Sequence, residues 1–503
     1  MADSYRVISR SPVVMHVGPK TITERRMDAD YYRPQFLENQ ERLKNSEQQL
    51  MELKCLWSEG KYGILPPSSD YTDRGIVLIR GGDFQDLGVV DDENLVRVPA
   101  HYWEDNPKAR AKASEILLLA KGATIDGPNS VALCPPRFDK ALVNGSIFRI
   151  RPKQSVDAAY LAAYMATPVF LLQKHRAISN IGIFYNDLES IGSFLVPLPP
   201  RPVQEYIGAK VRLAERCRTR ARELWEASEQ LLSEALGMPL GTEHLERIDQ
   251  AELRSDSYQL ASANPVVTWV QSDIVERELG PHYFHPRRAN VILKLRSSGV
   301  ELKRLADLAE RRNERVRADK VSQVPYYVGL ADIDSMTGYF EPISPKEAGI
   351  SGTSALFKSG DILFSKLRPY LNKVSICPAH VKQACGSTEL LVYRANQSVL
   401  SYYVFFAIKS NVGLYQIIDV TAGSTLPRVD PEIVDDILVP LIPVEHQQTI
   451  DASICQAFAL RHRATQLVRE AKADVEALIE GQLDAEGIVA GRVQPPRWED
   501  LEV

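Results

Sequence analysis

The second half of this chain repeats the first. Four short motifs recur in the same order: Ser4–Val7 as Ser257–Leu260, Pro12–Val14 as Pro265–Val267, Tyr31–Pro34 as Tyr283–Pro286, and Val196–Leu198 as Val439–Leu441. The offset between the copies drifts only from 253 to 243 residues. A long-period repeat constrains the fold strongly, because each copy must build the same unit. The sequence therefore predicts a tandem pair of similar halves, roughly 4–236 and 257–483.

Both halves follow one plan, in which a compact mixed region leads into a long helix. Short apolar runs predict strands at Gly75–Ile79, Glu115–Leu119 and Ile362–Phe364. Turn signals accompany them at Gly81–Asp83 and Ser359–Asp361. This pattern predicts an α+β fold with a mixed α/β domain in each half.

Two matched helices follow these regions. Steps of four and three residues give each helix a seam: Ile207, Val211, Ala214, Arg218, Ala221, Trp225, Ser228, Leu232 and Ala235, matched 243 residues later by Ile450, Ile454, Ala457, Arg461, Ala464, Val468, Ala471, Val475 and Leu478. Seams this similar favour two long antiparallel coiled-coil helices related by a pseudo-twofold axis. The alternative is that each helix packs only on its own half. The predicted domains are 1–200 and 257–443, the helices 201–236 and 444–483, the linker 237–256 and the tail 484–503.

The charge balance neither indicates nor excludes a nucleic-acid partner. The 503 residues include 60 Lys and Arg and 65 Asp and Glu, a net charge of −5, and a local basic face can exist within such a total. Six scattered cysteines are typical of a reducing cytoplasm, and the longest apolar stretch, Val399–Ile408, is too short to span a membrane. His282 and His285 have no further ligand in register, so no metal site is predicted.

Two similar modules at a fixed separation suit a target with two half-sites. Duplex DNA is such a target, because the symmetry of a two-module reader is matched by the spacing of its half-sites. The two modules differ in sequence, so the two half-sites should differ as well.

Several segments resemble the specificity (S) subunit of type I restriction–modification systems. The resemblance covers the opening of a target recognition domain (Asp28–Pro34), a turn-and-strand motif (Lys358–Ser365), and the start of a conserved-region helix (Ile437–Pro443 with Glu445–Ile450, and more weakly Leu195–Pro200 with Gln204–Ile207). The first half departs from the turn motif, because its matching segment by position, Leu119–Ile125, has no Gly-Asp pair.

The resemblance implies a non-catalytic subunit that reads a bipartite double-stranded DNA sequence. It would dock two adenine methyltransferase subunits and restriction nuclease–translocase subunits. S-adenosylmethionine, ATP and Mg²⁺ would bind those partners and no cofactor would bind this chain. The sequence has no phosphate-binding Gly-x-x-x-x-Gly-Lys loop, and Cys134–Phe138 lacks the amide or carboxylate of an amino-methyltransferase motif. Glu301–Lys303 has a nuclease-like Glu-x-Lys spacing, but is predicted to be the exposed start of an amphipathic helix.

Loops that combine cations with amides, hydroxyls and aromatic rings are the candidate DNA contacts. Lys and Arg neutralise phosphates, while Arg and Asn read base edges. The second-half candidates are Ser365, Lys366, Arg368, Tyr370, Asn372 and Lys373 after one strand, and Ser424, Thr425 and Arg428 in the loop Thr421–Arg428. The first-half candidates are Arg80, Lys121, Asn180 and Tyr185. The alternative for each loop is an ordinary solvated loop, and the same alternative holds for the cations of Lys210–Arg222 on the first long helix.

Three other functions stay open on the sequence alone. The same reader could serve another methylation-based phage-defence system, the two modules could form a scaffold that binds only proteins, or the chain could be a self-contained enzyme. The enzyme would need catalytic motifs that are missing here. Salt-dependent binding to duplex DNA separates a reader from a protein scaffold.

Overall fold

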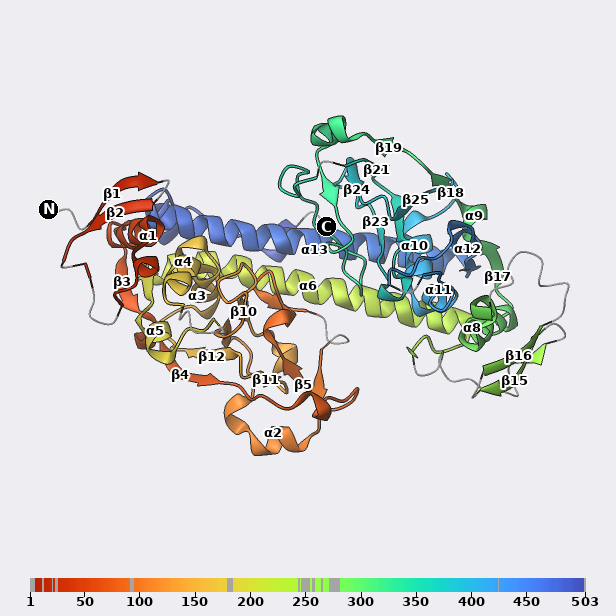
Figure 1. The fold of residues 1–503 in the computed structure, drawn as a ribbon, viewed down its shortest axis with the longest axis horizontal. Coiled ribbons are helices and arrows are strands. Elements are labelled where there is room, and N and C mark those ends of the chain that lie inside the picture. Colours follow the sequence, from red (N-terminus) through yellow and green to blue (C-terminus); the bar gives the residue numbers. More distant parts are fainter. Residues whose placement is uncertain are drawn as a thin grey trace. The chain divides into compact units, whose positions relative to one another are not determined.

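The computed structural model describes residues 5–10, 13–19, 21–22, 26–90, 95–178, 184–242, 245, 254–255, 258–263, 266–270, 281–350, 352–423 and 425–501. The chain divides into two compact units, and Figure 1 labels many of their elements. The first unit contains Met1–Cys217 and Arg463–Glu502, and the second contains Arg218–His462 with Val503. Both units combine helices with sheets, which confirms the α+β class.

Two helices of 36 residues each follow the mixed regions, α6 (Arg201–Leu236) and α13 (Val444–Ile479). The seam residues are buried, apart from the half-buried Arg218, Trp225, Ala235 and Arg461. In the first unit Lys210 Nζ of α6 lies 2.5 Å from Asp474 Oδ2 of α13. In the second unit Leu232 of α6 and Ile450 of α13 share one core. Each unit therefore brings one part of α6 against one part of α13.

Each unit has a hairpin near the start of its repeat. β1 (Tyr5–Arg10) pairs with β2 (Val13–Val17), and β15 (Tyr258–Ala263) pairs with β16 (Val266–Val270). Tyr5 pairs with Val17, and Tyr258 pairs with Val270 at an offset of 253. The register also shifts at the same place in both hairpins, between Val7 and Ser9 and between Leu260 and Ser262. The repeat found in the sequence thus extends to strand register.

The main sheet has four strands in each unit, in equivalent order. In the first unit the order is β10 (Val131–Leu133), β9 (Ile116–Leu119), β12 (Ile147–Pro152) and β4 (Trp57–Tyr62). In the second it is β23 (Val374–Ile376), β22 (Asp361–Ser365), β25 (Leu390–Ala395) and β18 (Ala309–Arg312). The strands predicted around Glu115–Leu119 and Ile362–Phe364 are confirmed as β9 and β22, and form the inner part of these sheets.

A second small sheet accompanies each main sheet. In the first unit its order is β11 (Leu142–Val143), β5 (Ile76–Ile79) and β8 (Arg97–Val98). In the second unit its order is β19 (Arg315–Val316), β21 (Ser354–Lys358), β24 (Gln383–Gly386) and β20 (Tyr327–Val328). Both contain one parallel pair, β11 with β5 and β24 with β20. β5 confirms the strand predicted at Gly75–Ile79.

Buried polar contacts between helix and strand also repeat. The hydroxyl of Tyr160 in α3 (Ala158–Met165) donates to Pro197 O at 2.6 Å, and that of Tyr403 in α10 (Ser401–Lys409) donates to Pro440 O. These prolines lie in β13 (Leu195–Leu198), which pairs with β3 (Gln49–Glu52), and in β26 (Leu438–Leu441), which pairs with β17 (Glu301–Arg304). The sequence repeat therefore preserves the hydrogen bonds that attach these helices to their strands.

Two sequence predictions are wrong in detail. Glu301–Lys303 does not begin a helix, because it pairs with β26 as the edge strand β17. The first-half counterpart of the turn at Lys358–Asp361 is Lys112–Glu115 rather than Leu119–Ile125. Lys112 N donates to Glu115 Oε2 at 3.0 Å, as Lys358 N donates to Asp361 Oδ2 at 2.9 Å. Ser114 takes the positive φ (64°) that Gly360 has in the second unit (80°), so the missing Gly-Asp pair hid the equivalence.

Shorter elements complete both units. The first also contains α1 (Pro34–Lys44), β6 (Phe84–Gln85), β7 (Gly88–Val89), α2 (His101–Asp105), α4 (Pro168–Arg176), α5 (Leu188–Ser193) and α14 (Ala485–Val489). The second contains β14 (Arg254–Ser255), α8 (Pro286–Ser297), α9 (Leu305–Leu308), α11 (Asn411–Leu414) and α12 (Pro431–Asp435). Within the described ranges, none of the helices combines the length and apolarity needed to span a membrane.

Candidate nucleic-acid interface

In the second unit the two loops predicted to contact DNA lie side by side. The loop after β22 and the loop Thr421–Arg428 form a short antiparallel bridge between Leu367 and Arg428. Arg368 N donates to Pro427 O at 2.7 Å, and Val429 N donates to Lys366 O at 3.0 Å. Segments about 60 residues apart in the sequence thus form one surface at the end of β22.

Three cations and one carboxylate lie at this junction. Arg428 Nη2 is 2.8 Å from Glu389 Oε1, and Lys366 Nζ is 3.8 Å from Glu389 Oε2. The hydrogen bond from Arg428 holds the pKa of Glu389 below its ordinary value. With Arg368, which donates to Thr425 O at 3.4 Å, the junction carries a positive balance. A positive surface of this kind attracts phosphate.

The turn that follows the first of these loops is strained and exposed. Arg368 (φ 48°) and Asn372 (φ 49°) both adopt the left-handed conformation, on either side of the short 3₁₀ turn Pro369–Leu371. Non-glycine residues hold this conformation only where surrounding contacts enforce it, and such residues cluster at functional sites. Tyr370, at the tip, is 45% exposed. Its ring is therefore available to a partner.

Other predicted contacts have different environments. Ser365 is 2% exposed and donates to Leu367 O at 2.9 Å. Asn372 Nδ2 donates to Lys409 O at 2.9 Å, and Lys373 Nζ donates to Ile333 O. Burial lowers the pKa of the Lys373 amine. These side chains stabilise the loop through hydrogen bonds to backbone carbonyls of the same unit. Thr425 is exposed, and Ser424 lies outside the described residues.

The first unit has the same junction with different side chains. Lys121 and Tyr185 form a bridge equivalent to the one between Leu367 and Arg428. Asn186 N donates to Ala120 O at 2.9 Å, and Ala120 N donates to Ser146 O at 2.8 Å. In the second unit the matching bonds are Val429 N to Lys366 O and Lys366 N to Glu389 O, both 3.0 Å. The same backbone positions therefore present Ala120, Lys121 and Tyr185 in one unit and Lys366, Leu367 and Arg428 in the other.

The remaining first-half candidates divide between described and undescribed residues. Lys121 Nζ lies 4.9 Å from the centroid of the Tyr62 ring. Arg80 N donates to Asp83 Oδ2 at 2.7 Å, and burial raises the pKa of that carboxyl. The neighbouring Gly81 lies against the Leu119 side chain, which brings the Arg80 turn to the end of β9. Asn180 lies outside the described residues.

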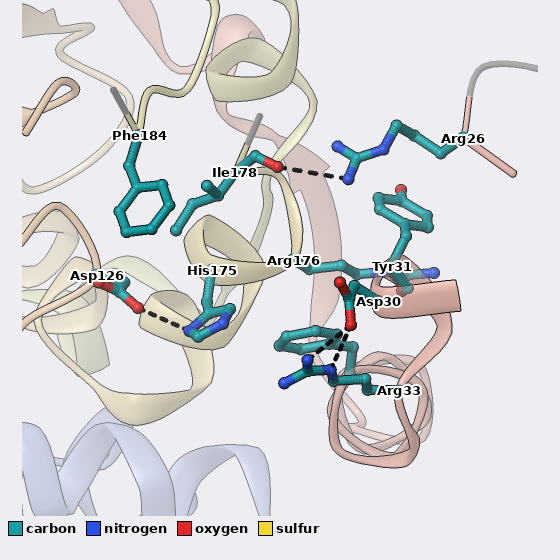
Figure 2. Close-up of a pocket in the computed structure, with 10 residues that line it drawn as sticks. Arg26, Asp30, Tyr31, Arg33, Asp126, His175, Arg176, Ile178 and Phe184 are labelled. Atoms are coloured by element: carbon teal, nitrogen blue, oxygen red, sulfur yellow. Dashed lines mark hydrogen bonds and ion pairs between the residues drawn. The ribbon is translucent and has the colours of Figure 1, made fainter. Parts of the chain in front are cut away.

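A separate pocket of about 140 Å³ lies in the first unit, between the 3₁₀ segment Ala29–Tyr32 and the end of α4 (Figure 2). The guanidinium of Arg176 lies 4.1 Å from the centroid of the Tyr31 ring, and that of Arg26 lies 4.8 Å from it. Carboxylates pair with three of the lining side chains: Asp28 with Arg26, Asp30 with Arg33, and Asp126 with His175. Arg176 donates to Tyr31 O and Gln40 Oε1. These contacts join the N-terminal segment to α4, and the pocket is not part of the loop junction.

Much of the basic run on α6 is engaged within the protein. Lys210 pairs with Asp474, Arg212 pairs with Asp157 at 2.9 Å, and Arg216 stacks on Trp498 at 4.3 Å. Arg220 and Arg222 pair with glutamates one turn further along the helix. The described part of the chain therefore favours the loop junctions over this helix face as candidate interface.

No cluster of three or more His, Cys, Asp or Glu side chains suited to a metal ion occurs in the described ranges. His285 instead lies 3.1 Å from Asp419, and Arg287 also pairs with that carboxylate.

No family model matches the chain. The Type I restriction enzyme EcoDI specificity subunit of Escherichia coli is 27% identical over 137 residues, which span 27% of this chain and 30% of that relative's length. Two solved structures are also similar. They are the S subunit of a type I restriction–modification system from M. genitalium (TM-score 0.39, 12% identity, 88% of this chain and 96% of that one) and the HsdS subunit from Thermoanaerobacter tengcongensis (TM-score 0.27, 15% identity, 86% and 97%). As its motifs predict, the chain is similar to the specificity subunits of type I restriction–modification systems.

Proposed function

We propose that this protein is the DNA-recognition subunit of a type I restriction–modification system and reads a bipartite target. The observation that carries the proposal is the repeated loop junction, which has matching backbone hydrogen bonds but different side chains in the two units. A conserved frame with variable side chains suits two half-sites of different sequence, because base edges are read by side chains. The contacts we propose are Lys366, Arg368, Tyr370, Thr425 and Arg428 in one unit and Lys121, Tyr185 and Arg80 in the other.

The rest of the assembly follows from the same proposal. The mixed regions act as two target recognition domains, and α6 and α13 form the coiled coil that separates them. Two adenine methyltransferase subunits and the nuclease–translocase subunits dock on this chain in the cytoplasm. They bring S-adenosylmethionine, ATP and Mg²⁺, while this chain supplies sequence recognition for phage defence.

The test is selection of duplex DNA from a random pool by the purified full chain. We expect enrichment of two different short half-sites at one fixed spacing, with an affinity that falls as salt rises. Enrichment without any sequence preference would contradict the proposal, and failure to retain duplex DNA at low salt would favour the protein-only scaffold.

A further inference from the structure

Each unit contains a fully buried lysine next to its loop junction. Lys174, at the end of α4, is 0% exposed, and Lys409, at the end of α10, is 2% exposed. Neither amine pairs with a carboxylate of the described residues. Burying an amine away from countercharge is costly, so an observed case needs a structural reason.

The hydrogen bonds of these amines supply that reason. Lys174 Nζ donates to Leu119 O at 3.0 Å and to Ser130 Oγ at 3.1 Å. Leu119 is the last residue of β9, directly before the Ala120–Lys121 frame. Lys409 Nζ donates to Ser335 O at 2.7 Å and to Asn372 O. Asn372 closes the exposed turn that carries Tyr370. Lys409 therefore binds the backbone of a loop that we propose to contact DNA, and Lys174 binds the strand residue that directly precedes such a loop.

An asparagine completes each contact. Asn372 Nδ2 donates to Lys409 O at 2.9 Å, and Asn186 Nδ2 donates to Lys174 O at 3.0 Å. The backbone N–H of Asn186 is the donor to Ala120 O, so this residue links the lysine to the loop frame. The two lysines are not equivalent in the repeat, since Lys174 and Lys409 are 235 residues apart whereas nearby elements are offset by 243. The two units thus reach a similar contact, a buried amine bound to the backbone beside the junction, from different positions.

We propose that Lys174 and Lys409 are positioning residues, each of which fixes the DNA-reading loop of its own unit without touching DNA. Loss of one amine then weakens reading of one half-site and leaves the other intact. This inference rests on the proposed function.

The charge state of the amines gives a second readout. Burial lowers the pKa of both lysines to about 7, although Asp126 opposes the shift at Lys174, and Asp334 opposes it at Lys409 while the cation of Lys373 adds to it. If a loop opens, its lysine meets water and regains an ordinary pKa near 10.5. The open loop then binds more protons than the closed loop between pH 7 and pH 10, so closure is favoured as pH rises through this range.

The experiment is duplex selection with the full chain and its Lys174→Met and Lys409→Met variants at pH 7 and pH 9. Methionine keeps the apolar stem but cannot donate to a carbonyl. We expect base discrimination to fall about tenfold in one half-site only, a different half for each variant, as for carbonyl groups left without a donor. For the wild-type chain, base discrimination should rise from pH 7 to pH 9 in both half-sites. In each variant, this rise should vanish in the half-site read by the unit that carries the methionine.

Matched controls separate a positioning role from general damage. Lys140→Met and Lys382→Met change exposed lysines of the same two units and should leave both half-sites unchanged. Asn186→Ala removes a buried amide with no route to DNA, and should reproduce the loss seen with Lys174→Met. Equal loss in both half-sites, no loss in either, or an unchanged pH response would overturn the inference. A wild-type chain that selects no sequence would instead overturn the proposed function.

Discussion

The loop junctions of the two units have the same backbone contacts and different chemistry. In the second unit, Lys366 and Arg428 flank Glu389, and the junction is basic. In the first unit the same backbone positions hold Ala120, Tyr185 and Ser146, and Lys121 lies over an aromatic ring. The strands and their hydrogen bonds fix where the loops meet, so side chains can vary without loss of the frame. Under the proposed function, this difference predicts stronger phosphate attraction by the second unit.

The largest expected effect comes from removing the basic side chains of the second junction. Lys366→Ala, Arg368→Ala and Arg428→Ala together should lower affinity for the selected duplex on the order of 100-fold, because phosphate and base contacts are lost at once. The half-site read by the first unit should keep its base preference. Fluorescence anisotropy and repeated selection measure the two effects. Loss of preference in both half-sites would argue against separate readers.

The repeated tyrosines should stabilise the two units to a similar degree. Tyr160→Phe and Tyr403→Phe each remove the hydroxyl that donates to a proline carbonyl of the neighbouring strand. An unsatisfied buried carbonyl costs about 1–3 kcal/mol. Thermal and urea unfolding of both variants should show comparable losses, whereas Tyr370→Phe, at an exposed turn, should show almost none. A large loss of stability in only one of the two variants would show that the repeated hydrogen bonds do not stabilise the two units equally.

Both units should become more stable as pH rises above neutrality. The folded pKa of Lys174 and Lys409 is about 7 and the ordinary value is 10.5, so the unfolded chain binds more protons between these values. Each lysine then adds about 1 kcal/mol of stability per pH unit in this window, and the penalty of its buried charge is fully present below pH 7. Urea unfolding from pH 6.5 to pH 8.5 measures the slope, because burial raises the pKa of the Cys134 and Cys377 thiols and their titration opposes the trend at higher pH. Lys409→Met should reduce that slope, and an unchanged slope would contradict the assignment.

The smallest effect is expected from the one carboxylate of the second junction. Glu389→Gln keeps the shape of the side chain but removes the negative charge that pairs with Arg428 and Lys366. Affinity for any duplex should rise a few-fold, and the dependence on salt should steepen by about one ion. Salt titrations of the wild-type chain and the variant provide the measurement. Weaker binding would mean that Glu389 itself accepts a hydrogen bond from the DNA.

The sequence predicted the parts of the fold that periodicity encodes. The seams gave both long helices, and the apolar runs gave β5, β9 and β22. The motif repeat also agrees with hairpin register at an offset of 253. The strand Glu301–Arg304 was missed because a short edge strand with three charged residues resembles an exposed helix turn. Ser114 concealed the second copy of the turn, since a positive φ is expected of glycine.

The candidate site was only partly accessible from sequence. Cation-rich loops could be recognised, but no local pattern shows that the loop after β22 meets Thr421–Arg428. The buried role of Asn372 depends on Lys409, and Glu389 comes from a third segment. One signal was present in the sequence. Lys409 directly follows the longest apolar stretch, and a lysine in that position is expected to bury its aliphatic stem.

The central claim is that each half reads its own part of a bipartite DNA sequence. Its most direct test replaces residues 25–200 with the corresponding module of another such protein and maps adenine methylation by long-read sequencing in cells that supply the methyltransferase subunits. The account predicts a new sequence in one half-site, with the other half-site and the spacing unchanged. A change in both half-sites, or in neither, would contradict it.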